Sequence, residues 1–204
     1  MIRKLDHKTL VIGMQHLQKV DEDLSKIIKK NKNSIKLYKR SPGFMGLINL
    51  IVEQQLSVTS AKAIFKRIND CLPKFNENNF FNLSNEKLKE AGLSKQKILY
   101  SKGIAKAAIN KKLNFRSLNS LKDEDVVSFL TSFKGVGEWT AHCYLLGCLA
   151  RTDAWPSSDL GLQIAVEKIK NLKKRPKKLT MEKIAEPWKP FRSVAALLLW
   201  STYD

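Results

Sequence analysis

The sequence predicts an all-α protein, and three observations carry this prediction. Apolar residues recur at helical spacing along most of the chain. No stretch shows the sustained alternation of apolar and polar residues that is typical of a half-buried strand. The 204 residues are 43% hydrophobic, which is enough to bury a core in one domain or in two lobes that share a cleft.

The expected helices follow one another along the chain. The first helical pattern covers residues 6–30. After a break at Ser41, Pro42 and Gly43, a second helix is expected from Phe44 to about Ile68. Its apolar stripe predicts a deeply buried face, made of Phe44, Leu47, Ile48, Ile51 and Val52. The Asn-rich residues 76–85 are interpreted as a polar connection. Further helices are expected at residues 86–91, 95–111, 123–133, 139–150, 160–171 and 194–203.

The charge of the chain indicates a polyanionic partner. Lysine and arginine number 37 against 19 acidic residues, a formal net charge of +18. A membrane is disfavoured because no apolar run approaches the roughly 20 residues that a span needs. The N-terminal sequence does not resemble a secretory signal, and three cysteines at no framework spacing favour reduced thiols inside a cell. The basic residues 168–183 fit either a nucleic-acid patch or a solvated connection.

Residues 133–159, FKGVGEWTAHCYLLGCLARTDAWPSSD, carry the most information about function. Gly135 and Gly137 flank Val136 between two expected helices, and glycine lets backbone amides approach a ligand closely. These amides precede a helix that begins near Glu138, where the helix dipole favours an anion such as a DNA phosphate. An ordinary helix-helix turn is the alternative interpretation. A dinucleotide fingerprint fits less well, because no strand precedes Gly135 and Thr140 stands in place of the third glycine.

At this point the chain resembles the helix-hairpin-helix (HhH-GPD) DNA glycosylases, in particular the 3-methyladenine DNA glycosylase II branch. Three blocks carry the resemblance in the order of the family: residues 47–68, residues 133–146, and WPSSDLGLQ followed by EPWKPFRSVAALLLW. The resemblance implies a single domain over residues 1–204 with two helical lobes and an active-site cleft between them. One lobe comprises about residues 1–40 plus 150–204, and the other about residues 44–149.

The resemblance also implies an activity: flipping of alkylated purines out of DNA and hydrolysis of their N-glycosidic bonds, the first step of base excision repair. Asp159 matches the catalytic aspartate, which stabilises the sugar cation or orients water. Local sequence alone favours a helix N-cap role for Asp159 over catalysis, and the two roles are compatible. The alternative function is a non-catalytic helix-hairpin-helix protein that binds damaged or bent DNA.

One catalytic carboxylate is enough for this chemistry, because a purine alkylated at a ring nitrogen is already cationic and leaves without an acid. In bifunctional relatives, a lysine of the second hairpin helix attacks the sugar; Trp139 occupies that position here. The resemblance therefore implies a hydrolase without lyase activity, which leaves an intact abasic site.

Other site residues follow from the matched positions. The base pocket is expected to involve Trp139, Trp200, Cys143 and Tyr144; Cys143 stands where relatives place an aromatic residue. The DNA wedge that fills the space of the extruded base is expected at Gln55, with Gln54 and Leu56 as alternatives. Phosphate binding is expected at Gly135, Gly137, Glu138, Trp139 and Thr140.

No cofactor is expected. An iron-sulfur cluster needs four cysteines and the chain has three, and the set His142, Cys143 and Cys148 is poorly placed for a metal because neighbours on a helix diverge. A monovalent cation at the hairpin carbonyls is left open. The expected partner is double-stranded DNA with alkylated bases, bound by a monomer. The expected location is the cytoplasm or nucleoid of a prokaryote, or the nucleus of a eukaryote.

Overall fold

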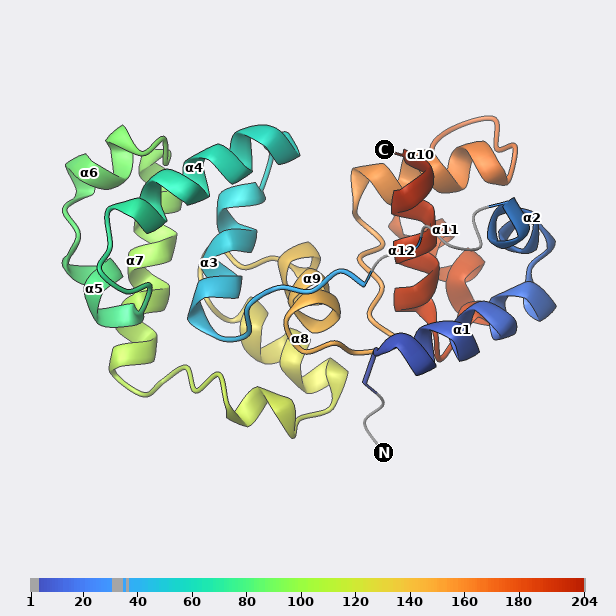
Figure 1. The fold of residues 1–204 in the computed structure, drawn as a ribbon, viewed down its shortest axis with the longest axis horizontal. Helices are drawn as coiled ribbons and strands as arrows, with labels where there is room; N and C mark the ends of the chain where they lie inside the picture. The colour runs from blue at the N-terminus through green and yellow to red at the C-terminus, as the bar shows by residue number, and fades with distance from the viewer. Residues whose placement is uncertain (1–3, 31–34, 36, 204) are drawn as a thin grey trace. The chain divides into compact units, whose positions relative to one another are not determined.

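Helices are the main secondary structure in the described part of this protein (Figure 1). A computed structural model describes residues 4–30, 35 and 37–203. Within those ranges there is no strand, and a single isolated antiparallel bridge joins Lys4 to Arg151. The prediction of an all-α fold is confirmed.

The first of two compact units combines the two ends of the chain, Met1–Lys39 and Leu145–Asp204. Within it, α12 packs against α10 and against the pair of helices near the N-terminus (Figure 1). Trp155 and Trp188 lie in its core, 1% and 0% exposed, with their rings edge to face at 5.3 Å. The helices of this unit are α1 (His7–Val20), α2 (Glu22–Lys30), α10 (Leu160–Ile169), α11 (Lys178–Ala185), the 3-10 helix η2 (Glu186–Trp188) and α12 (Arg192–Tyr203).

The second unit is continuous, Arg40–Tyr144. Its centre is α3, which packs against α4 and α7, and α7 in turn contacts α5 and α6. The stripe predicted to be buried is confirmed: Phe44 is 4% exposed and Leu47, Ile48, Ile51 and Val52 are fully buried. The helices are α3 (Phe44–Glu53), α4 (Val58–Asp70), α5 (Glu77–Asn82), α6 (Asn85–Glu90), α7 (Lys95–Ile109), η1 (Ser117–Asn119), α8 (Asp123–Thr131) and α9 (Glu138–Gly147), whose last three residues belong to the first unit.

The prediction of one long helix from Phe44 to about Ile68 is wrong. The helix stops at Glu53, and a new one begins at Val58 after the cap Ser57, whose side chain accepts a hydrogen bond from the Ser60 N–H. Between them Gln55 has a left-handed backbone, with φ of +56°. The apolar spacing continues through the break, so periodicity alone does not reveal it.

Two segments contain short helices that the sequence did not predict, so the interpretation of residues 76–85 as a polar connection is wrong, whereas a nucleic-acid role for the basic residues 168–183 stays a prediction. Asn76 caps α5, where Phe80 is fully buried. The second half of the basic segment forms α11, which buries Met181. Each helix is only about two turns or less, too short to show a period against its polar residues. The helix expected at residues 86–91 is present as α6, which begins one residue earlier after the cap Ser84, whose side chain accepts from the Lys87 N–H.

Candidate functional site

The turn between α8 and α9 has a backbone that requires glycine at one position. Gly135 has φ of +91°, and a Cβ there would lie 2.2 Å from Cγ of Tyr100. The Val136 N–H closes the turn by donating to the Phe133 carbonyl at 3.0 Å, and the Val136 side chain is buried. Gly137 faces open space, because a Cβ at this position would have no heavy atom within 4 Å. Gly135 is therefore required by the backbone conformation of the turn and by its contact with Tyr100. Gly137 is not required by packing, and it leaves the neighbouring backbone exposed.

The predicted phosphate-binding residues lie together where α9 begins. Gly137 and Glu138 are exposed, and Trp139 is half-buried. Amides of the first helical turn have no partner within the helix and point out of its N-terminus. Thr140 differs from the others because its side chain is 1% exposed and its Oγ1 accepts a hydrogen bond from Gln54. Phosphate binding at this turn stays a prediction.

Gln54 points inward, not toward solvent. Its Nε2 donates to the Gly135 carbonyl at 2.9 Å and to Thr140 Oγ1 at 3.0 Å. These bonds occupy the amide in bracing the hairpin, so the structure disfavours Gln54 as a wedge. Gln55 is exposed, and Leu56 is 41% exposed. The wedge therefore stays a prediction for Gln55 and Leu56 only.

A lysine that the sequence analysis did not identify binds the backbone at the end of α3, just before Gln55. Lys97 of α7 donates from Nζ to the Val52 carbonyl at 2.7 Å and to the Gln54 carbonyl at 2.6 Å. Burial of the ammonium group lowers the pKa of Lys97. No local pattern marks this residue, since a lysine in a helix is ordinarily a solvated surface group.

Asp159 caps α10 and also receives a bond from a second helix. Its Oδ1 accepts from the Leu162 N–H at 2.8 Å, which confirms the N-cap interpretation. The same oxygen accepts from Nε1 of Trp200 on α12 at 3.0 Å. Asp159 is half-buried, and its carboxylate lies at the N-terminus of α10. Asp159 and Trp200, two of the predicted site residues, are thus brought into direct contact.

Trp200 has a second aromatic neighbour that the sequence did not reveal. The ring of Tyr38 lies 5.6 Å from the ring of Trp200, centroid to centroid, at an angle of 45°. Both side chains are half-buried. Tyr38 is far from Trp200 in the sequence and matches no motif, so only the folded chain reveals the pair.

Cys143 and Tyr144 lie inside the protein. Cys143 is 2% exposed and Tyr144 is fully buried. The Tyr144 hydroxyl accepts a hydrogen bond from the Gly43 N–H at 3.0 Å, and its ring lies 6.3 Å from that of Phe115. These contacts give Tyr144 a structural role at the start of α3. Contact of either side chain with a base stays a prediction.

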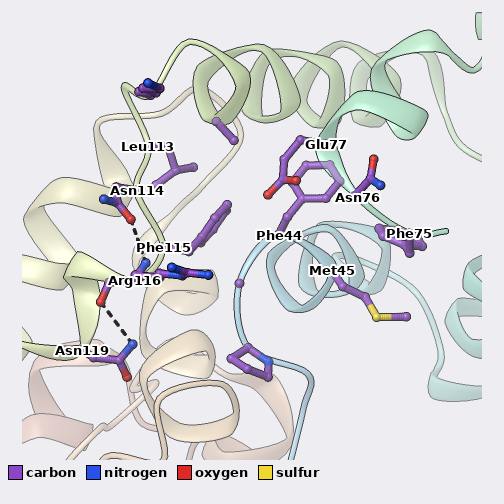
Figure 2. Close-up of a pocket in the computed structure, with 14 residues that line it drawn as sticks. Phe44, Met45, Phe75, Asn76, Glu77, Leu113, Asn114, Phe115, Arg116 and Asn119 are labelled. Atoms are coloured by element: carbon purple, nitrogen blue, oxygen red, sulfur yellow. Dashed lines mark hydrogen bonds between the residues drawn. The ribbon is translucent and has the colours of Figure 1, made fainter.

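A pocket of about 730 Å³ opens in the second unit, and no residue of the stretch 133–159 lines it (Figure 2). Phe44, Phe75 and Phe115 contribute aromatic walls, and Glu77 and Arg116 contribute charges. In Figure 2 the Asn114 side chain accepts from the Arg116 N–H, and Asn119 donates to the Arg116 carbonyl. None of the predicted site residues lines this pocket.

Within the described residues there is neither a cluster of metal-ligating side chains nor a helix fit to span a membrane. They contain no group of three or more His, Cys, Asp and Glu side chains that could hold a metal ion. Among the helices of these same residues, none is both long and apolar enough to cross a bilayer.

The basic loop before α11 exposes several cations to solvent, whereas its Pro176 is buried. The exposed cations are Lys173, Lys174, Arg175 and Lys177.

The fold and the glycine turn between α8 and α9 define a helix-hairpin-helix protein. A family model described as HhH-GPD superfamily base excision DNA repair protein matches residues 48–190. Because this match covers well over half of the chain, the protein belongs to the HhH-GPD superfamily of base excision DNA repair proteins.

Named relatives lie within this superfamily. The chain is similar to DNA-3-methyladenine glycosylase 1 of Schizosaccharomyces pombe, with 31% identity over 92% of this chain and 85% of that protein. It is also similar to alkylbase DNA glycosidase-like protein mag2 of the same organism, with 28% identity over 91% and 90%. The solved structure of the S. pombe 3-methyladenine DNA glycosylase with abasic DNA has a TM-score of 0.87 and 28% identity, over 93% of this chain and 95% of that one.

Proposed function

We propose that this protein is a DNA glycosylase that removes alkylated purines of the 3-methyladenine type by hydrolysing the bond between base and sugar. Membership in a base excision repair superfamily and two relatives named for this type of reaction support the proposal. The net charge of +18 fits a DNA substrate. The observation that carries the catalytic part is the placement of Asp159 at the N-terminus of α10, with Trp200 donating to it.

Asp159 is proposed as the catalytic residue. As the cationic base departs, positive charge develops on the sugar, and an ionised carboxylate stabilises that charge or orients the attacking water. Hydrogen bonds from Leu162 and Trp200 hold Oδ1 in one position, so the carboxylate needs little reorganisation during the reaction. Trp139 and Trp200 are proposed to contact the extruded base, and Gln55 to occupy the space that it leaves.

We propose that the reaction stops at the abasic site. Trp139 stands where bifunctional relatives carry their attacking lysine, and an indole cannot form a Schiff base. Purified protein should therefore yield abasic sites that break only after heat or alkali. Borohydride treatment during the reaction should trap no covalent protein-DNA adduct, and a trapped adduct would contradict the proposed hydrolysis.

The decisive experiment compares base release by the wild type and by Asp159→Asn. Asparagine is also a good N-cap, so α10 should stay intact and the melting temperature should change little. Release of 3-methyladenine from methylated duplex DNA should fall by about 100-fold or more, the size of effect seen when a preorganised electrostatic group is removed. Affinity for the duplex should be nearly unchanged.

The same experiment distinguishes a glycosylase from the alternative, a non-catalytic protein that binds damaged or bent DNA. A wild-type protein that binds methylated or abasic DNA and releases no alkylated purine would instead be a non-catalytic binding protein. Undiminished release by Asp159→Asn would remove the catalytic role from Asp159 and leave the glycosylase assignment standing.

A further inference from the structure

Both segments of the second unit that are proposed to contact DNA rest on one helix. These segments are the hairpin turn at Gly135 and the turn at Gln55 and Leu56. Helix α7 contacts both of them through Lys97 and Tyr100, which are three residues apart and so share a face of the helix. The ring of Tyr100 fills the space directly beneath Gly135, which explains why a side chain there would collide with it.

Lys97 anchors the end of α3. Its ammonium group donates to the carbonyls of Val52 and Gln54, the last residues before the left-handed Gln55. A cation is favoured at this end of a helix, where unpaired carbonyls form the negative pole. The anchor is maintained although burial disfavours the charged form and lowers the pKa of Lys97.

Gln54 extends this anchor to the hairpin. Its carbonyl accepts from Lys97, and its side-chain amide donates to the Gly135 carbonyl and to Thr140 Oγ1. A continuous hydrogen-bonded path therefore leads from α7 through the end of α3 to the start of α9. All of its members belong to the Arg40–Tyr144 unit.

The backbone at Gln55 needs such an anchor. A residue other than glycine rarely adopts positive φ, and it holds this conformation only where its surroundings impose it. Gln55 and Leu56 are exposed, so contacts of their own side chains do not impose it. The Leu56 N–H closes the turn by donating to the Glu53 carbonyl at 3.2 Å, and Gln54, the residue before Gln55, is held through both its carbonyl and its side chain.

We propose that Lys97 is a positioning residue for base extrusion. Through Gln54 it holds the Gln55–Leu56 turn at a set distance from the hairpin, so that the wedge enters the duplex in register with the phosphate that the hairpin binds. This role rests on the proposed function. It predicts that removal of Lys97 impairs extrusion and base release, whereas binding to undamaged DNA persists.

The chain provides a matched control in Lys102, on the same helix. Its Nζ donates to the carbonyls of Phe81 and Leu83 at the end of α5, and burial likewise lowers its pKa. Lys102 is thus the same kind of helix anchor, but none of these bonds leads to the hairpin or to the Gln55 turn. Its removal should reduce stability without affecting extrusion.

The test compares Lys97→Met, Lys97→Arg and Lys102→Met. We expect Lys97→Met to slow single-turnover release of 3-methyladenine at saturating protein by about tenfold, equivalent to 1.4 kcal/mol. It should also reduce the fluorescence increase of 2-aminopurine next to an abasic analogue, while affinity for undamaged duplex stays near that of the wild type. Lys97→Arg should restore both signals, since a guanidinium also donates to carbonyls. Lys102→Met should release base at the wild-type rate.

Several outcomes would overturn the proposal. They are equal rates for Lys97→Met and Lys102→Met, or a decrease in undamaged-DNA affinity that matches the decrease in rate. If Lys97→Met does not fold, Gln54→Glu tests the same path, because it keeps the size of the side chain but replaces the amide donor. Gln54→Glu should then reproduce the decrease in fluorescence and rate. A wild type that releases no base but raises 2-aminopurine fluorescence would defeat the proposed function alone.

Discussion

The indole Nε1 of Trp200 donates to Oδ1 of Asp159 at 3.0 Å. The two residues are 41 positions apart and lie on α12 and at the start of α10, two helices that pack against each other. The Leu162 N–H donates to the same oxygen. A carboxylate held by donors from two helices has one preferred orientation, which is what a proposed catalytic aspartate needs at the moment when charge develops.

Trp200→Phe should therefore slow base release without unfolding the protein. It removes the indole donor and keeps an aromatic ring, and Asp159 still caps α10. A hydrogen bond to a charged group contributes about 1.5–3 kcal/mol, so a rate decrease of at least about tenfold is expected in single-turnover assays. Trp188→Phe is the control, because Nε1 of Trp188 makes the same kind of bond to Asp21 at 2.8 Å. It should lower stability and leave the rate per folded molecule unchanged.

The two glycines of the hairpin should respond differently to alanine. Gly135→Ala forces a Cβ against Tyr100 and strains a positive φ, so we expect the free energy of unfolding to fall by about 2–5 kcal/mol. Gly137→Ala meets no neighbouring atom and should fold normally. Its methyl group should nevertheless weaken DNA binding, because it lies where the backbone is predicted to approach a phosphate.

Urea denaturation and binding to undamaged duplex measure the two effects separately. Wild-type affinity of Gly137→Ala would argue against phosphate binding at this turn. The double variant Gly135→Ala with Tyr100→Ala should recover only part of the stability, since the ring atoms are removed, whereas Cβ of residue 100, at 2.6 Å from the added Cβ, and the backbone strain both remain.

The basic loop before α11 should contribute to DNA affinity in a salt-dependent way. Affinity falls as salt rises, and Lys173→Gln with Lys174→Gln should make this fall less steep. The slope of log affinity against log salt should decrease in magnitude by up to about 0.9 for each phosphate that the loop no longer neutralises. Lys87→Gln with Lys89→Gln on α6 removes the same charge from another exposed surface. Equal slopes for the two double variants would mean that the salt dependence follows from net charge alone. The loop would then be a solvated connection and not a DNA-binding surface.

Lys170 should stabilise the first unit over a defined pH range. Its ammonium group binds Asp21 at 2.8 Å and Asp23 at 3.0 Å. Burial opposes the charge, yet the hydrogen bonds to both carboxylates raise the pKa of Lys170 above its usual 10.5. The bond from Lys170 lowers the pKa of Asp23 below its usual 3.8.

Lys170→Met should accordingly cost about 2–3 kcal/mol near neutral pH, less than a fully buried pair because Lys170 is 23% exposed. The raised pKa of Lys170 gives stability that is complete below pH 10.5 and is lost as the pH rises through its folded-state pKa. The lowered pKa of Asp23 gives stability that is present above pH 3.8 and is lost as the pH falls through its folded-state pKa. Urea denaturation of both proteins across pH should show their difference shrinking at both extremes.

Much of the fold was predictable because helices that bury an apolar stripe show a clear period. The stripe at Leu47 and Ile48, the helix around Lys97 and the hairpin before Glu138 were all expected, and the structure contains them. The break at Gln55 was not predictable, because the apolar spacing continues through it. The short helix after Asn76 was missed since two turns are too few to show a period against polar residues.

The sequence by itself determined the helical class, the glycine turn and the position of Asp159 at the start of a helix, because each depends on residues adjacent in the chain. Only the tertiary structure decided which side chains meet. In the folded chain Gln54 donates a hydrogen bond to the hairpin, and Trp200 donates one to Asp159. Lys97 binds a carbonyl at the end of α3. Local backbone preferences act over a few residues, whereas hydrogen bonds between packed helices depend on where the whole chain brings distant residues together.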